Sequence, residues 1–143
     1  MKPTAFIDSN VWIAGVASLS GGSARVLDLC HAGLVEPLVS REVLVEVDRN
    51  LRKKLPQLLR AFKELFATLR PRICPPASDE VLQMASEVVH PKDAAILAAA
   101  LQAGVDYLVT LDMRHFGAVA PHVAASIRIV TPGELLNDLL PDR

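Results

Sequence analysis

Short apolar runs alternate along this chain with segments of helical pattern, and this alternation constrains the fold more than any other feature. Four of the runs are candidate strands: Thr4–Ile7, Leu34–Val39, Asp106–Thr110 and Ile127–Val130. Strands that alternate with helices pair in parallel, and the helices then cover both faces of the sheet. The pattern therefore predicts the α/β class, as a three-layer α/β/α domain with a central parallel sheet.

Capping residues, glycines and prolines set the ends of the expected helices. These helices run from Ala24 to before Gly33, from Ser40 to about Lys54, from Pro56 to before Pro71, from Ser78 to about Val89, from Pro91 to Ala103, and from Thr131 to Leu140. Asp8, Ser9 and Asn10 follow the first strand and are typical of a helix cap or a turn. Pro37 confines the second strand to an edge of the sheet or to a strand end, and Ile73–Cys74 is a brief extended piece.

Length and composition limit the class of protein. The chain has 143 residues, so we expect residues 1–143 to form a single domain. With 51% apolar residues and a net charge of −1 it can bury a core, which excludes a disordered chain. No apolar run approaches the roughly 18–20 residues of a membrane span, and no apolar segment of secretory length precedes the first carboxylate. We therefore expect a cytoplasmic protein with no membrane partner, in which Cys30 and Cys74 are reduced core thiols.

Charge is unevenly distributed along the chain. The segment from Arg49 to Arg72 holds eight basic residues and the single acid Glu64, a local charge of +7, and the rest of the chain carries −8. A basic segment beside an acid-rich remainder can hold a phosphate backbone next to a carboxylate site. The alternative is that the basic residues form the solvated face of two surface helices.

Acidic residues stand at the ends of the expected strands. Asp8 directly follows the first strand, and Asp112 comes two residues after Thr110 closes the third. The carboxyl ends of parallel strands share one edge of the sheet, where ligands bind, and Asp93 in the first turn of the preceding helix faces that same edge. Asp106 starts the third strand, so a rise of about 3.3 Å per residue places it roughly 20 Å from Asp112, on the far edge.

Glu46 is placed by helical geometry. It flanks the apolar stripe of its helix and shares that side with Arg49 and Lys53. Four carboxylates that converge without cations repel one another, so such a cluster usually holds a divalent metal. All-oxygen ligands select Mg²⁺ or Mn²⁺ over Zn²⁺, and the histidines of the chain show no zinc spacing.

Each of these residues also has a structural alternative. Asp8 could cap a turn and Asp112 a loop. Asp93 could be a carboxylate in the first turn of a helix, where the helix dipole stabilises a negative charge, and Glu46 alone would be an exposed helix residue. Ser9, Asn10 and Thr110 stand beside the proposed ligands and can orient carboxylates or bound water, although turn capping explains the first two equally well.

Four motifs, in this order, resemble PIN-domain nucleases, and in particular the VapC-like toxin components of bacterial toxin–antitoxin pairs. They are Phe6-Ile7-Asp8-Ser9-Asn10-Val11, Ser40-Arg41-Glu42-Val43-Leu44-Val45-Glu46, Pro91-Lys92-Asp93-Ala94-Ala95-Ile96-Leu97-Ala98-Ala99-Ala100 and Tyr107-Leu108-Val109-Thr110-Leu111-Asp112. The resemblance spans Ala5 to about Leu136. No single motif is specific, so the signal lies in their order and spacing.

The resemblance implies a Mg²⁺- or Mn²⁺-dependent ribonuclease with a central parallel sheet. By motif position the acidic quartet of the family falls on Asp8, Glu46, Asp93 and Asp112, with Ser9 or Asn10 and Thr110 as supporting residues. It also implies homodimers and, for toxins, a small antitoxin protein that covers the active cleft. Many relatives carry a further acid near Asp93 or Asp112, where this chain has Pro91-Lys92 and Met113-Arg114-His115, so the number of bound metal ions stays open.

The function expected from the sequence is hydrolysis of RNA phosphodiester bonds by a metal-activated water. The four acids would bind the metal, and Arg49, Lys53 and Arg114 would position the phosphate. One alternative is a catalytically weak PIN-like module that binds RNA or protein without cutting it. Another is a phosphoacceptor domain, but the phosphatase pattern needs a second Asp where Asn10 stands, and the receiver pattern needs an acidic pair near the end of the first strand.

Overall fold

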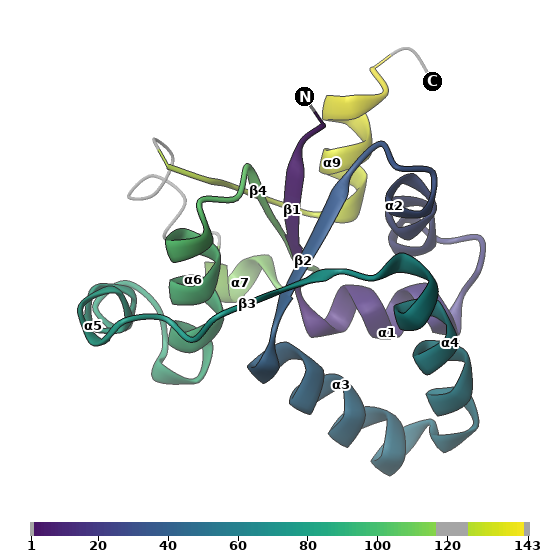
Figure 1. Ribbon diagram of the computed structural model, residues 1–143, viewed down its shortest axis with the longest axis horizontal. Coiled ribbons are helices and arrows are strands. Elements are labelled where there is room, and N and C mark those ends of the chain that lie inside the picture. The colour runs from purple at the N-terminus through teal and green to yellow at the C-terminus, as the bar shows by residue number, and fades with distance from the viewer. Residues whose placement is uncertain (1, 117–125, 142–143) are drawn as a thin grey trace.

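One parallel sheet lies at the centre of the computed structural model, which describes residues 2–116 and 126–141 (Figure 1). Its strands are β1 (Thr4–Ile7), β2 (Glu36–Ser40), β3 (Arg72–Cys74), β4 (Tyr107–Val109) and β5 (Arg128–Val130). They lie in the order β3-β2-β1-β4-β5, and every neighbouring pair is parallel. The predicted central parallel sheet is confirmed, and the brief extended piece at Ile73–Cys74 is its fifth strand.

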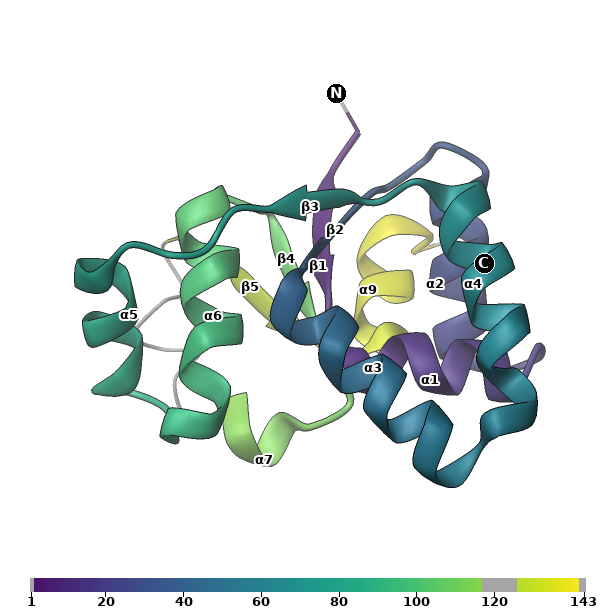
Figure 2. The ribbon, with the colours of Figure 1, turned by 60° about the horizontal axis from the view of Figure 1, so that its bottom comes forward.

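Helices flank the sheet on both sides, as predicted for a three-layer α/β/α domain. They are α1 (Ser9–Ala17), α2 (Gly22–His31), α3 (Arg41–Lys54), the 3₁₀ turn η1 (Pro56–Leu58), α4 (Leu59–Leu69), α5 (Asp79–Ser86), α6 (Pro91–Ala103), α7 (Met113–Phe116) and α9 (Pro132–Leu139). Figure 2 shows α5 and α6 on one side of the sheet and α1, α2, α4 and α9 on the other. None of the helices within the described ranges is long and apolar enough to cross a membrane.

The strand order reverses direction between β1 and β4. From β1 the chain moves outward to β2 and β3, and then returns to the other side of β1 for β4 and β5. Ile7 pairs with Val109 at the carboxyl ends of the two central strands, so the residues that follow these strands emerge side by side. A switch point of this kind is where open α/β sheets bind their ligands.

Several local features follow the expected chemistry. Pro37 lies at the start of β2 and pairs with β1 alone, because β3 pairs with β2 only from Leu38 onward. The N–H group that proline lacks is therefore not needed for a hydrogen bond between strands. Gly104 ends α6 with a φ of 68°, a conformation that glycine adopts without strain. Cys30 and Cys74 are buried and unpaired, as predicted for core thiols.

Helix α1 is the largest departure from the sequence-based expectation, which placed only a cap or turn at Asp8–Asn10. Val11, Ile13 and Gly15 are weak helix formers, and α1 is buried on more than one side, so it lacks the one-sided stripe that marks a surface helix. Tertiary packing stabilises it instead. Helix α5 also ends at Ser86 and not near Val89.

Candidate active site

Asp8 lies at the switch point, where β1 ends and α1 begins. Its backbone N–H donates to the carbonyl of Val109 at 3.0 Å, which ties the end of β1 to the end of β4. The carboxylate caps α1 by accepting the backbone N–H of Ser9 at 2.8 Å, and it accepts the hydroxyl of Thr110 at 2.8 Å. Asp8 is therefore both a helix cap and a carboxylate fixed at the ligand-binding edge of the sheet.

The surroundings of Asp8 favour its neutral form. Burial raises the pKa of this carboxyl group from 3.8 to about 6, although the hydrogen bonds from Thr110 and Ser9 act in the opposite direction. The negative charges of Glu46 and Asp93 act in the same direction as burial and contribute to the value of about 6. The carboxyl group of Asp8 is therefore easier to protonate than that of an exposed helix cap, chiefly because it is buried.

Thr110 and Asn10 link the loop after β4 to α1. The hydroxyl of Thr110 accepts the backbone N–H of Asp112 at 3.0 Å, and the side-chain amide of Asn10 donates to the same hydroxyl at 3.3 Å. The Asn10 carbonyl oxygen accepts the backbone N–H of Leu111 at 3.1 Å. These contacts tie the backbone at Leu111 and Asp112 to Asn10 and to Thr110, whose hydroxyl also donates to Asp8.

Glu46 reaches the same edge from α3. The side chain of Ser40 caps this helix at the N–H of Val43, and the buried Val43 fixes the rotation of α3 against the core. Glu46 then lies beside the core and accepts a hydrogen bond from the hydroxyl of Ser9. Ser9 therefore holds two acids, Asp8 through its backbone and Glu46 through its side chain.

Asp93 and Asp112 meet around a histidine that the sequence analysis did not select. The Nδ1 atom of His115 lies 3.0 Å from Oδ2 of Asp93 and 3.0 Å from Oδ2 of Asp112. Asp93 is 8% exposed, and its Oδ2 is fully buried yet accepts no hydrogen bond within the described residues, since the geometry at His115 is unsuitable. His115 lies on the short helix α7, three residues after Asp112. This spacing, which brings side chains together on a helix, is the one signal for His115 in the sequence.

The structure thus brings together all four acids expected at this edge, with their three supporting residues. It places Asp106 at the opposite edge, where its carboxylate accepts the backbone N–H of Thr4 at 2.9 Å. Among the described residues, no three His, Cys, Asp or Glu side chains already have the geometry of a metal site. Of the expected phosphate-binding residues, Arg49 lines a cavity with Glu46, and Lys53 and Arg114 are exposed on α3 and α7.

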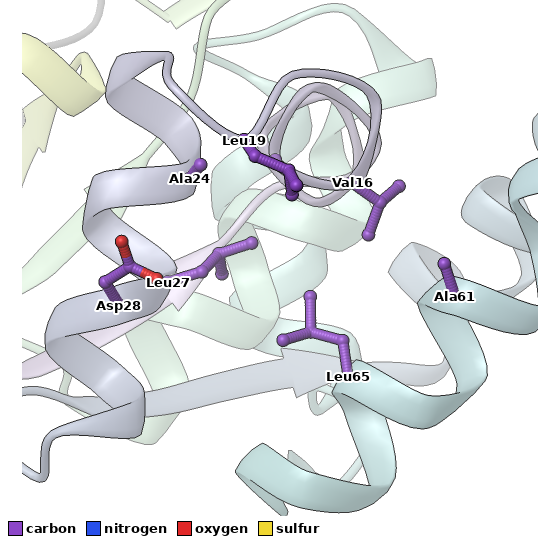
Figure 3. A pocket seen from close by; sticks show the side chains of 8 residues that line it. Val16, Leu19, Ala24, Leu27, Asp28, Ala61 and Leu65 are labelled. Atoms are coloured by element: carbon purple, nitrogen blue, oxygen red, sulfur yellow. The ribbon is translucent and has the colours of Figure 1, made fainter.

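A larger cavity lies away from these acids. It has a volume of about 360 Å³ and is enclosed by α1, α2 and α4 (Figure 3). Its lining is mostly apolar, and Asp28 at its rim is the one carboxylate that lines it. This cavity contains none of the predicted acids.

The fold and the site together define the general class of the protein: a parallel α/β domain with an acidic cluster at its switch point. The family model described as PIN domain matches residues 4–114, a range that runs from β1 into the start of α7 and includes all four acids. The chain belongs to the PIN domain family. No curated protein sequence matches it.

Three solved structures have a similar fold, and one of them is a toxin. VapBC2 from Rickettsia felis, solved bound to a DNA fragment from its promoter, is similar with a TM-score of 0.65 and 14% identity over 90% of this chain and 98% of that chain. PAE2754 from Pyrobaculum aerophilum gives a TM-score of 0.64 and 19% identity over 99% and 100% of the two chains. VapC20 of Mycobacterium tuberculosis is described as a toxin that cleaves the sarcin–ricin loop. It gives a TM-score of 0.52 and 17% identity over 73% of this chain and 86% of that chain.

Proposed function

We propose that this protein is a Mg²⁺- or Mn²⁺-dependent endoribonuclease and the toxin of a toxin–antitoxin pair. The observation that carries the proposal is the convergence of Asp8, Glu46, Asp93 and Asp112 on one edge of the sheet. Membership of the PIN domain family supports nuclease chemistry, and the RNA-cleaving toxin VapC20 has a similar fold.

The donor set fits a hard divalent cation. It consists of carboxylate oxygens, which Mg²⁺ and Mn²⁺ prefer. Two features point the same way: the buried Oδ2 of Asp93 accepts no hydrogen bond from the residues that the structure describes, and the pKa of Asp8 is raised to about 6 by burial and by neighbouring acids. A bound cation would give the Oδ2 atom of Asp93 a partner and would lower the pKa of Asp8 again.

The residues of this chain would prepare the site for hydrolysis. Thr110 and the Ser9 N–H fix both oxygens of the Asp8 carboxylate, and the Ser9 hydroxyl fixes Glu46. A bound Mg²⁺ or Mn²⁺ ion would activate a water molecule and offset the charge on the leaving oxygen. Asp8 has to lose its proton before it can act as a ligand, so binding of Mn²⁺ to the protein should strengthen as pH rises through about 6.

Asp112→Asn should abolish metal-dependent cleavage of a mixed RNA pool. The amide keeps the shape of the side chain but removes its charge, so we expect cleavage in Mn²⁺ to fall at least about 100-fold, to the level seen in EDTA. The matched control is Asp106→Asn, the same change at the opposite edge of the sheet, which should retain wild-type activity. Equal, EDTA-sensitive cleavage by wild type and Asp112→Asn would contradict the proposal, and wild-type RNA binding without cleavage would favour a catalytically weak binding module.

His115→Ala should strengthen Mn²⁺ binding. Nδ1 of His115 lies 3.0 Å from Oδ2 of Asp93 and 3.0 Å from Oδ2 of Asp112, so the imidazole ring occupies the space between two of the proposed ligands. His115 therefore competes with the cation for Asp93 and Asp112. Its removal should tighten binding about three- to tenfold in isothermal titration, because the ring no longer has to leave the space between the two carboxylates when the ion binds. Weaker Mn²⁺ binding by His115→Ala would show instead that the imidazole is a ligand.

We also propose an antitoxin protein as the partner, a homodimeric assembly and a location in the cytoplasm. The likeness of the fold to VapBC2 supports the first of these. Co-purification of the protein with the product of an adjacent short gene would test it directly.

A further inference from the structure

A second cavity lies against the acidic cluster. It has a volume of about 310 Å³ and is lined by Arg41, Glu42, Val45, Glu46, Arg49 and Lys92. Glu46 belongs both to this lining and to the acidic cluster, and Lys92 directly precedes Asp93. The cavity is therefore an extension of the candidate active site, formed where α3 meets the first turn of α6.

The cations of this cavity are available to a ligand. Several other basic residues form ion pairs in the described parts of the chain, as Arg52 does with Asp48 and Arg60 with Glu64. Arg41, Arg49 and Lys92 form none with any described carboxylate, and all three are exposed. Three free cations from two helices thus face one cavity, whose own acids are Glu42 and Glu46.

The lining suits a nucleotide unit of a single strand. Arginine guanidinium groups bind phosphate through two parallel hydrogen bonds, and lysine adds a point charge. Val45 is 50% exposed and gives the cavity an apolar wall against which a ribose or base can pack. The volume is at the lower end of the range for small-ligand pockets, which begins at about 300 Å³.

We propose that this cavity holds the nucleotide next to the cleaved bond, with its phosphate on Arg41, Arg49 and Lys92. The inference rests on the proposed function, because it assumes that RNA occupies the acidic site. It adds Arg41 and Lys92 to the phosphate-binding residues expected from the sequence. It also separates Arg49, which lines the cavity, from Lys53 and Arg114, which do not.

The test is the binding of a mixed-sequence single-stranded RNA oligonucleotide in EDTA, measured over a range of salt concentrations. Each phosphate contact contributes about 0.7 to the slope of log K against log salt concentration for a single strand. The double variant Arg41→Ala/Lys92→Ala should therefore lower the slope by about 1.4, and affinity should fall at least about tenfold. The control Lys2→Ala/Arg25→Ala removes the same charge from the residues before β1 and from α2, outside the cavity and outside the basic segment Arg49–Arg72, and should change the slope much less.

The outcomes separate the two proposals. A reduced slope in the Arg41/Lys92 variant alone supports the cavity as a phosphate site. Equal slopes and affinities in the two double variants would overturn the cavity inference and leave the nuclease proposal standing. If the wild-type protein binds no RNA at any salt concentration, the cavity inference is wrong, whereas the nuclease proposal is decided separately by cleavage in Mn²⁺. Thermal unfolding of each variant checks that these exposed substitutions leave the fold intact.

Discussion

Asp8→Asn should abolish cleavage of RNA and, at the same time, make the metal-free protein more stable. Loss of a ligand carboxylate removes several kcal/mol of charge stabilisation in the transition state, so we expect cleavage to fall by about 10³-fold or more. In the absence of metal, however, the same carboxylate is a buried charge near Glu46 and Asp93, and its pKa is raised to about 6. An amide removes that unfavourable charge.

The gain in stability should depend on pH in a defined direction. Because the pKa of Asp8 is higher in the folded state (about 6) than its ordinary value of 3.8, the folded state binds the proton more tightly. Ionisation therefore destabilises the fold progressively as pH rises from about 4 to 6, by about 3 kcal/mol in total, at about 1.4 kcal/mol per pH unit. The hydrogen bond from the Thr110 hydroxyl is weaker to an amide than to a carboxylate, which offsets about 1 kcal/mol of the stability gained by removing the charge.

Urea unfolding in EDTA at pH 4 and pH 8 measures the effect. We expect Asp8→Asn to be about 2 kcal/mol more stable than wild type at pH 8 and no more stable than wild type at pH 4. The control Asp106→Asn should show no such gain at pH 8. A loss of stability in Asp8→Asn at both pH values would contradict the expected gain and mean that the hydrogen bonds of the Asp8 carboxylate outweigh the cost of its buried charge.

Trp12→Ala should destabilise the protein more than any single change at the site. Trp12 is fully buried on α1, and its indole N–H donates to the carbonyl of Ile7 at 3.1 Å. Its ring packs edge-on to Phe62, with centroids 6.0 Å apart, and at 6.3 Å from Phe66. Trp12 thus joins the end of β1, next to Asp8, to α4.

Truncation of a large aromatic residue in a core costs about 3–5 kcal/mol, a large part of the total stability of a typical domain. We expect the midpoint of thermal unfolding to fall by about 10 °C or more. Trp12→Phe keeps most of the packing but leaves the Ile7 carbonyl without its donor, so it should cost less. Leu19→Ala, at a side chain that is 85% exposed, is the matched control. A fall in midpoint as small as that of Leu19→Ala would show that the aromatic cluster does not stabilise the fold.

The sequence was sufficient to predict the parallel sheet and the residues at its carboxyl edge. Strand ends are marked by local changes in residue type, as at Asp8 after Ile7 and at Thr110 after Val109. In a parallel sheet these ends meet at one edge, so local signals were enough to predict a long-range arrangement. Glu46 was predictable for a different reason, because the apolar stripe of α3 fixes the side on which it lies.

Three features depended on packing between distant segments and were missed or incomplete. Helix α1 is stabilised by tertiary contacts around Trp12, which propensity does not reveal. His115 approaches Asp93 only because α7 folds back towards the start of α6. Arg41 and Lys92 share a cavity because α3 meets α6, although they are far apart in the sequence.

A near-neutral net charge is compatible with RNA as the substrate. The basic surplus between Arg49 and Arg72 is only one source of cations, since Arg41 and Lys92 lie outside that segment yet flank the acids. Binding should therefore depend on local contacts more than on long-range attraction.

Isothermal titration of the metal-free protein with Mn²⁺ at pH 8, for wild type and Asp8→Asn, tests most directly whether these carboxylates form a metal site. We expect saturable binding to wild type, at one or two ions per chain, and its loss in Asp8→Asn even though that variant is folded and more stable. Equal binding by the two proteins, or no binding to wild type, would contradict a metal site at this edge of the sheet.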